Sequence, residues 1–484
     1  MGFFLNFMAH PTFFLVLSLL LIPASTHLQS KEQGYVSVLL SDKGIDFAKN
    51  MLIKKAISSM IPLHLPDIKK SVKIPLLGQV HMVLSNITIS SVRVASSSVE
   101  TGEMGIVLVA SGVTADLTMN WRYSYKSWIV VISDSGDASV QVKDMEVGLT
   151  FTLEEQDGSL NLSLLDSGCY VKDMSIKLDG GASWLYQRVV DAFEGPIGSA
   201  VENAISKKIK EGILKLDSRL QSLPKQVSVD HVSAMNVTFV DDPVLSNSSV
   251  EIDINGLFMA KDNILIPNYY YEGLQASDSS NCAAKMVGIS LHENVFNTAV
   301  VVYFNAGYMH WIVDRFPNQS LLNTATWRFV YPQLYKKYPN DDMNLNVSLT
   351  SPPVIRIAEN NLDGTIYLDV IVNVLDADEV IPVACVSLVI RSSCSPQILM
   401  NKLAGFLKLK SFTVSYKWSN IGDLHMRLLR PVAFAILKTV FLPYVNSHLL
   451  KGLPLPFLHG FTLKNAEIHY TNSKMMICSN LALT

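Results

Sequence analysis

A long amphipathic helix dominates the pattern of apolar and polar positions in this chain. Between Ser183 and Leu223, apolar side chains recur every three or four residues, which places them on one side of an α-helix. These side chains are Leu185, Val189, Phe193, Ile197, Val201, Ile205, Ile209, Ile213, Leu216 and Leu220. At the rise of an α-helix the segment would be about 60 Å long. Pro196, between two glycines, predicts a kink. A helix with one narrow apolar stripe needs a long apolar surface to lie against.

The residues before the helix predict such a surface. From Val72 to Leu165 apolar and polar residues alternate between turn residues, which indicates an antiparallel meander with one dry face. Ahead of the meander, Val36 to Ile61 predicts a shorter helix with Ser41 as its N-cap and Pro62 as its stop.

The same order recurs in the second half of the chain. A helical pattern (289–307) precedes strand-like runs, and a second long helical run (423–452) follows them. We therefore expect a signal peptide (1–27), a first domain (28–225), a connecting region with a central sheet (226–285), a second domain (286–456) and closing strands (457–484). Antiparallel sheets curling around long helices place the chain in the α+β class.

Composition favours a protein that encloses apolar material. The 484 residues are 49% hydrophobic and only 17% charged, and the mean hydropathy is +0.27. Globular domains usually have about 25% charged residues. The net charge of −3 gives no case for nucleic acid as a partner. We expect a monomer.

The N-terminus predicts secretion. The apolar run from Thr12 to Ile22 is too short to span a bilayer, and the small residues Ala24, Ser25 and Thr26 follow it, as in a secretory signal peptide. No later run of 18 apolar residues stands out, so we expect the mature chain to be soluble. Six sequons predict glycosylation in the secretory pathway, at Asn86, Asn161, Asn236, Asn247, Asn318 and Asn346.

The cysteines and the motif search narrow the possible chemistry. The five cysteines are Cys169, Cys282, Cys385, Cys394 and Cys478, and their wide spacing fits no metal site and no small disulfide scaffold. At most two bridges can form; one option joins Cys385 to Cys394 across a tight bend. The sequence has no GxSxG, HExxH or phosphate-binding glycine loop, so we expect neither an enzyme nor a metal protein. A lipase built from scattered residues and an adhesive β-protein remain as alternatives.

A C-terminal motif carries a family resemblance. The run Leu442–Asn446 followed by Lys451–Pro456 resembles the LPxVNxxLxKGxPLP segment of the bactericidal/permeability-increasing and lipopolysaccharide-binding protein family. Weaker matches at Ser419–Gly422, Phe296–Ala299 and Gly44–Ala48 occur in the same order along the chain. The six sequons and few cysteines look most like the plant members.

The resemblance implies an elongated protein with two tubular lipid-binding domains joined by a central sheet, each with a strongly twisted antiparallel sheet around a long helix. Each domain would hold an apolar pocket for a phospholipid, and no other cofactor is expected. Burial of an acyl chain gains about 0.8 kcal/mol per methylene. The expected pocket residues are Ile45, Leu52, Val189, Phe193, Ile197, Val201, Phe296, Val300, Phe434, Leu437 and Phe441. Ordinary core packing is the competing interpretation for each of them.

The resemblance also implies a headgroup site at the tip of the first domain. Endotoxin-binding members of the family use cations there to pair with phosphates and anionic sugars. The corresponding residues here are Arg122 and Lys126 in a hairpin predicted between Trp121 and Trp128, and Lys69, Lys70 and Lys73 in a neighbouring loop. The tip is only mildly basic. Two hypotheses follow: binding of bacterial lipopolysaccharide in defence, and transport of phospholipid between membranes.

The resemblance raises one further point about Cys169. In the family, a cysteine at this place bridges to a cysteine on the long helix, but the matching region here (204–208) contains none. Cys169 is therefore expected either as a buried free thiol or with a different partner.

Overall fold

The computed structural model describes residues 33–75, 77–126, 128–179, 183–261, 282–315, 319–377, 379–455 and 460–483. The side chains of 183–186, 189, 319 and 454 lie outside this description. The chain divides into two compact units, Met1–Gln33 and Gly34–Thr484, and everything below concerns the second. The predicted signal peptide (1–27) lies outside the described residues.

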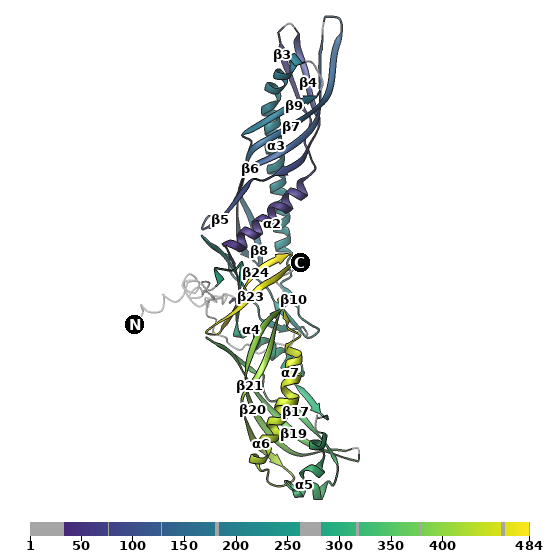
Figure 1. Cartoon of the computed structure of the whole chain (residues 1–484), viewed down its shortest axis with the longest axis vertical. Helices are drawn as coiled ribbons and strands as arrows, with labels where there is room; N and C mark the ends of the chain where they lie inside the picture. The colour runs from purple at the N-terminus through teal and green to yellow at the C-terminus, as the bar shows by residue number, and fades with distance from the viewer. Residues whose placement is uncertain are drawn as a thin grey trace, which may run out of the picture. The chain divides into compact units, whose positions relative to one another are not determined.

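The first half of the fold is a curled antiparallel sheet that packs on a long helix. Its main path is β2 (Leu63–His64), β4 (Gly78–Arg93), β6 (Gly105–Lys126), β7 (Val131–Gln156) and β8 (Ser159–Tyr170). Three strands join at its sides: β3 (Ile68–Ile74) pairs with β4, β5 (Ser96–Gly102) with β6, and β9 (Asp173–Asp179) with β7. The helix α3 (Ser183–Gln221) runs along this sheet (Figure 1).

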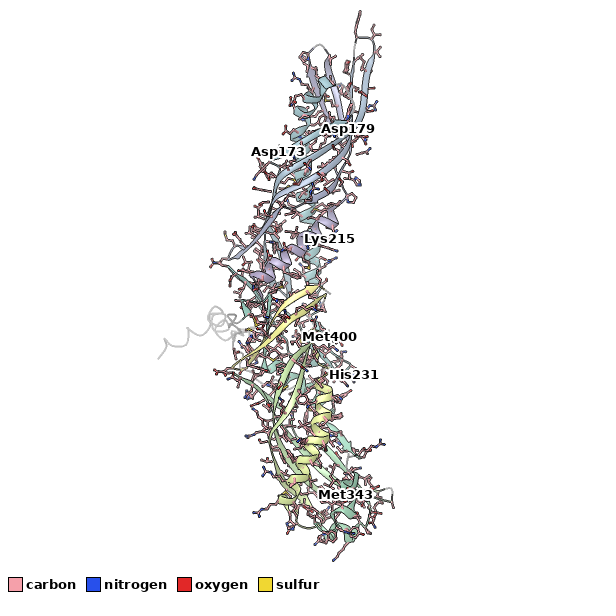
Figure 2. All side chains as sticks on the ribbon, in the orientation of Figure 1. Asp173, Asp179, Lys215, His231, Met343 and Met400 are labelled. Atoms are coloured by element: carbon pink, nitrogen blue, oxygen red, sulfur yellow. A yellow bond between two sulfur atoms is a disulfide. The ribbon has the colours of Figure 1, made fainter. Side chains whose placement is uncertain are left out.

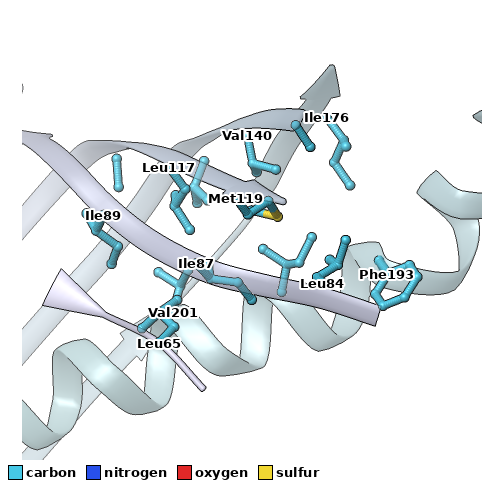
Figure 3. Close-up of a cluster of buried hydrophobic side chains, with 14 of the residues drawn as sticks. Leu65, Leu84, Ile87, Ile89, Leu117, Met119, Val140, Ile176, Phe193 and Val201 are labelled. Atoms are coloured by element: carbon cyan, nitrogen blue, oxygen red, sulfur yellow. The ribbon is translucent and has the colours of Figure 1, made fainter. Parts of the chain in front are cut away.

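The long helix confirms the sequence prediction in type and extent. The secondary structure is helical from Ser183 to Gln221, through Pro196. Side chains of the predicted stripe fill the interface with the sheet: Phe193, Ile197 and Val201 are 1%, 1% and 0% exposed. Figure 3 shows Phe193 and Val201 on the helix below sheet residues such as Ile87.

A central six-stranded sheet gathers strands from across the chain. Its order is β12 (Val244–Ser246), β13 (Ser249–Ile254), β1 (Val36–Ser41), β15 (Val287–His292), β24 (Lys474–Leu483) and β23 (Phe461–Thr471). A separate three-stranded sheet contains β10 (Gln226–Ser228), β11 (Ser233–Asn236) and β14 (Phe258–Ala260).

Two helix predictions are wrong at their N-terminal ends. Residues 36–41 and 289–292 belong to β1 and β15, and the helices α2 (Asp42–Met60) and α4 (Glu293–Asn305) begin after them. Ser41 does cap α2, because its hydroxyl accepts a hydrogen bond from the Gly44 amide, and the His292 ring caps α4 in the same way. Position 44 has no room for a side chain, because an added Cβ would be 2.2 Å from the Met286 carbonyl oxygen.

The second half repeats the plan with a different helix. Its sheet runs β16 (His310–Val313), β17 (Asp342–Leu349), β19 (Asn361–Asp376), β20 (Glu379–Leu399), β21 (Lys402–Ser419) and β22 (Leu453–Pro454), with β18 (Val354–Ala358) on β19. Short helices, among them α5 (Pro332–Lys337), connect β16 to β17. Met343 on β17, labelled in Figure 2, lies near this connection.

The second long helical run is interrupted rather than continuous. It consists of α6 (Met426–Ile436), a π-helical turn η4 (Leu437–Phe441) and α7 (Leu442–Leu449). By length and composition alone, Met426–Leu449 could cross a membrane. It is not an uninterrupted apolar run, because Arg427, Arg430 and Lys438 lie within it.

The disulfide pairing differs from the suggested one. Cys282 and Cys478 form a bridge, with their Cα atoms 5.3 Å apart. Cys385 and Cys394 cannot pair because both lie on β20, and both are free. Cys169 is also a free thiol, and burial together with the Glu202 carboxylate raises its pKa to about 12.

Candidate functional site

An apolar cavity lies between the second sheet and its helical run. Its volume is about 140 Å³, and its walls are almost wholly aliphatic and aromatic. Strand residues such as Val347 and Leu388 form one side, and Ala433, Leu437 and Phe441 form the other. An apolar cavity of about 150 Å³ can hold a ring of six carbons, so this space suits about six methylene groups. Its walls offer almost no polar partners.

The helix above the cavity is fixed to the sheet on one side by a buried side chain. Asn446 on α7 accepts a hydrogen bond from the Leu407 amide (2.7 Å) and donates one to the Leu407 carbonyl (3.1 Å). The Asn446 side chain thus makes the two hydrogen bonds to Leu407 of β21 that a neighbouring strand would make. Asn446 is the asparagine of the LPxVN motif, so the structure gives this motif residue a physical role.

On the opposite side the helix contacts the sheet through aromatic rings. Trp311 on β16 stacks on Phe441 (5.8 Å between centroids) and on Tyr444 (5.9 Å). Trp311 and Phe441 both line the cavity as well. Stacked aromatic side chains form the contact on this side, whereas on the other side Asn446 is hydrogen-bonded to the main chain of β21.

The structure separates the expected pocket residues of the second half. Leu437 and Phe441 line the cavity. Phe296 packs against the core of the central sheet, and Val300 is half-buried on the same helix, α4. Phe434 is 46% exposed and faces away from the cavity. Phe296, Val300 and Phe434 do not line this cavity, because α4 packs against the central sheet and Phe434 lies on the outer side of α6.

The expected pocket residues of the first half are mostly packed core. Phe193, Ile197 and Val201 contact sheet side chains directly, and Ile45 belongs to a small cluster with Ile106 and Val250. Leu52 is 38% exposed on α2. The side chain of Val189 lies outside the described residues. For the three α3 residues, the core-packing interpretation describes the observed contacts.

Four of the five predicted headgroup cations share one face at the end of the first sheet. Lys69 pairs with Val83, which pairs with Arg122, so these side chains project from the same face. Lys73 and Lys126 follow four residues further along the same strands and return to that face. We call this surface the outer face; all four cations on it are exposed.

A row of hydroxyls and one imidazole crosses the outer face between the cations. Ser71 pairs with His81, His81 with Ser124, and Ser124 with Ser133. The Ser71 hydroxyl and the His81 ring are hydrogen-bonded at 2.7 Å. Neighbouring strands lie about 4.8 Å apart, so cations and hydroxyls lie within reach of one phosphorylated sugar.

Lys70 does not belong to this surface. It pairs with Met82, and Met82 with Tyr123, so it projects from the opposite face although it is exposed. The prediction of a loop at 69–73 is also wrong, because these residues form β3. The predicted hairpin at 121–128 is displaced as well: β6 continues to Lys126 before the chain turns.

The opposite face carries an aromatic ladder. Trp121 stacks on Tyr123 (5.9 Å), and Tyr123 on Tyr125 (6.4 Å). The Trp121 ring nitrogen donates to the carbonyls of Asp137 and Asp179, and burial raises the pKa of Tyr123, with a further contribution from Asp134. The rings stack along β6, and the hydrogen bonds of Trp121 connect β6 to β7 and β9.

The turn between β6 and β7 exposes an uninterrupted apolar run that we call the apolar finger. Its residues are Trp128, Ile129, Val130, Val131 and Ile132, which are 95%, 81%, 60%, 63% and 42% exposed. Water-exposed apolar patches of this kind mark sites of contact with lipid or protein. Sequence reasoning interpreted this run as an ordinary strand. The available signal was five consecutive apolar residues without alternation beside two cations.

The predicted glycosylation sites fall in different environments. Asn86 and Asn247 are exposed, whereas Asn161, Asn236 and Asn346 are half-buried, and Asn318 lies outside the described residues. The Asn236 side chain accepts hydrogen bonds from the Thr238 amide and hydroxyl. Within the described part of the chain, no group of three or more His, Cys, Asp or Glu side chains is placed to hold a metal ion.

Comparisons with known proteins match nearly the whole chain to one protein family. Residues 44–223 match the N-terminal domain and residues 227–483 the C-terminal domain of the LBP / BPI / CETP family. A BPI/LBP family protein of Arabidopsis thaliana is 51% identical over 468 residues, covering 96% of each chain. The human lipopolysaccharide-binding protein is 24% identical, covering 96% of this chain and 97% of its own.

The solved structures agree on the fold. The crystal structure of a lipopolysaccharide-binding protein superposes with a TM-score of 0.67 at 20% identity, over 93% of this chain and 99% of that one. The two-domain α+β fold with curled antiparallel sheets is therefore the fold of this chain. With both domains matched along their length, the chain belongs to the LBP / BPI / CETP family of lipid-binding proteins.

Proposed function

We propose that this protein is secreted and binds bacterial lipopolysaccharide in defence, through the outer face and the apolar finger. The outer face is the observation that carries the proposal. Lipid A combines phosphates on a disaccharide with several acyl chains. Lys69, Lys73, Arg122 and Lys126 offer charge-assisted hydrogen bonds to the phosphates, and the row of hydroxyls suits the sugar. The adjacent apolar finger offers a surface for the acyl chains.

The names of the relatives support the same ligand class. Proteins named for lipopolysaccharide binding and for bactericidal permeability increase align with more than nine-tenths of this chain. The proposed action is binding without catalysis, in the secretory pathway, with a bacterial or other membrane surface as the partner.

A phospholipid carrier is the second candidate, and the cavity of the second half favours it. The cavity has room for about six methylenes, whose burial would contribute up to about 5 kcal/mol. The two functions use different parts of the molecule. A protein could therefore carry phospholipid in the cavity whether or not its outer face binds lipopolysaccharide.

The test compares the four cations of the outer face with Lys70, which projects from the opposite face of β3. The mature chain, made in a lipopolysaccharide-free eukaryotic host, is titrated onto immobilised lipopolysaccharide and lipid A at physiological salt. Changing Lys69, Lys73, Arg122 and Lys126 together to Ser should weaken binding on the order of a hundredfold or more, because each charged hydrogen bond contributes about 1.5–3 kcal/mol.

The single variants Lys69→Ser and Lys70→Ser form a matched pair, since Lys70→Ser removes an exposed charge from the opposite face of the same strand. Lys70→Ser is the control. It should leave the affinity within about twofold of the parent protein. If the parent does not bind either ligand, or if Lys70→Ser weakens binding as much as Lys69→Ser does, the outer face is not a lipopolysaccharide site. Phospholipid in the purified parent would then favour the carrier.

A further inference from the structure

The helix α6 has two apolar sides, and only one of them is covered. Ala433 and Ile436 project into the cavity, as does Leu437 at the start of η4. On the opposite side Leu428 and Phe434 are 49% and 46% exposed, and within α6 no residue is fully buried. Of the most apolar window in Met426–Leu449, only 11% is buried. A helix so apolar and so exposed needs a further partner for its outer side.

The uncovered side of α6 is also basic. Arg427 and Arg430 of α6 and Lys438 of the following η4 are exposed there. The sequence has no Asp or Glu between Leu424 and Leu449. In the part of the chain that the structure describes, these three cations form no ion pair with a carboxylate. Their charge is therefore available to an anionic partner.

Cations and apolar side chains are interleaved on this surface. Phe434 stacks on Phe412 of β21 with the ring centroids 6.2 Å apart. The Lys438 ammonium lies 5.9 Å from the Phe434 ring, and the Arg430 guanidinium 5.8 Å from the Phe412 ring. Long cationic side chains arranged in this way can keep their charge at the headgroups while their stems and the neighbouring rings enter the apolar boundary.

We propose that this outer side of α6 docks on an anionic phospholipid bilayer. The helix would lie in the plane of the interface, with Phe434 and Leu428 at the acyl boundary and the three cations at lipid phosphates. It would not span the bilayer, because its other side closes the cavity of its own domain. Docking there would place the cavity directly beneath the membrane surface. This surface is separate from the outer face and the apolar finger of the first half.

Acidic side chains restrict the contact to the helix. Asp423 lies just before α6, and Asp376 and Glu379 lie on the β19–β20 hairpin, next to strand residues that share a core cluster with Leu429. These carboxylates would be repelled by anionic lipid. The proposal therefore predicts contact along Arg427 to Lys438 and none at the hairpin.

The test uses vesicles of phosphatidylcholine with and without phosphatidylglycerol. It is done with the full mature chain in which Lys69, Lys73, Arg122 and Lys126 are Ser, so that the outer face does not contribute. R427Q/R430Q/K438Q should bind the anionic vesicles roughly a hundredfold less tightly, given the attraction of each surface cation to anionic lipid. The matched control K207Q/K210Q/K215Q removes three exposed cations from α3, including Lys215 of Figure 2, and should keep the parent affinity.

A spectroscopic reporter locates the contact independently of affinity. Phe434→Trp changes an exposed residue, and near-ultraviolet circular dichroism checks its fold. The emission of the new tryptophan is obtained by subtracting the spectrum of the protein without this change. It should shift to the blue on anionic vesicles and be quenched by brominated lipid. Unchanged emission on bound vesicles, or equal binding by R427Q/R430Q/K438Q and the control, would overturn the proposal. So would a concentration-dependent dimer that Phe434→Ser abolishes, because a second copy would then cover this surface.

Discussion

The two halves of this protein use one plan, a long helix on a curled antiparallel sheet, and fill it differently. In the first half, α3 is continuous, and its residues Phe193, Ile197 and Val201 are almost fully buried against the sheet. In the second half a π-helical turn interrupts the helix, and a cavity of about 140 Å³ remains. The shared architecture therefore does not fix how the helix–sheet interface is filled. The side chains at the interface do.

The difference has an energetic side. Side chains that line a cavity lack neighbours at van der Waals distance on that side, whereas Phe193, Ile197 and Val201 pack directly against sheet side chains. An acyl chain in the cavity would supply the missing contacts.

The largest expected effect comes from removing one phenylalanine from each helix. Phe193→Ala should lower the free energy of unfolding by about 3–5 kcal/mol, because the ring is enclosed on all sides. Phe441→Ala should cost about half as much, since this ring borders an existing cavity and has fewer contacts to lose. Urea denaturation followed by tryptophan fluorescence measures both. Equal losses would mean that the two interfaces are equally well packed.

A smaller effect, which differs between the two halves, comes from enlarging one alanine in each. Ala115 is 0% exposed in the first core, so Ala115→Leu should destabilise by about 1–3 kcal/mol through overpacking. Ala433 lines the cavity, so Ala433→Leu should be neutral or slightly stabilising.

The same alanine pair tests the carrier hypothesis. Ala433→Leu should also reduce the amount of phospholipid that mass spectrometry finds in the purified protein, while Ala115→Leu should not. If Ala433→Leu leaves the bound phospholipid unchanged, the cavity of the second half is not where phospholipid is held.

The extent of α3 was predictable because a helical stripe is a local property of the sequence. Its spacing of three and four residues is visible without knowing any contact, and the structure ends the helix at Gln221, close to the predicted end. The segments 36–41 and 289–292 were misassigned for the converse reason. A short apolar run fits either a strand or a buried helix. Its assignment depends on partners far along the chain: Val36 pairs with both Ile254 and Leu291.

The two candidate sites were predictable to different degrees. Lys69 and Arg122 could be named from the resemblance, but their shared face follows from the register of β3, β4 and β6, which no single strand encodes. The cavity was harder to predict from the sequence. Leu437 and Ile197 have the same pattern in sequence, yet one borders a void and the other a packed core. A void depends on volumes contributed by many distant residues.

The smallest expected effects come from one carboxylate on each sheet. In the first half, hydrogen bonds from the Ser91 hydroxyl and the Gln141 amide lower the pKa of Asp116, as does Arg93 at 3.0 Å. In the second half, partial burial acts to raise the pKa of Asp369. The Lys417 ammonium and the Ser387 hydroxyl outweigh this effect, so its pKa is lowered as well.

Both carboxylates should therefore stabilise the fold only while they are ionised. A lowered folded-state pKa gives stability that is present above the unfolded value, near 3.9, and is lost as the pH falls through the folded value. Asp116→Asn and Asp369→Asn should each cost about 1 kcal/mol at neutral pH. Well below pH 4, the free energy of unfolding of each variant, measured by urea denaturation, should equal that of the parent. A difference that persists in acid would show that the amide disturbs packing, and that the charge itself contributes little in that half.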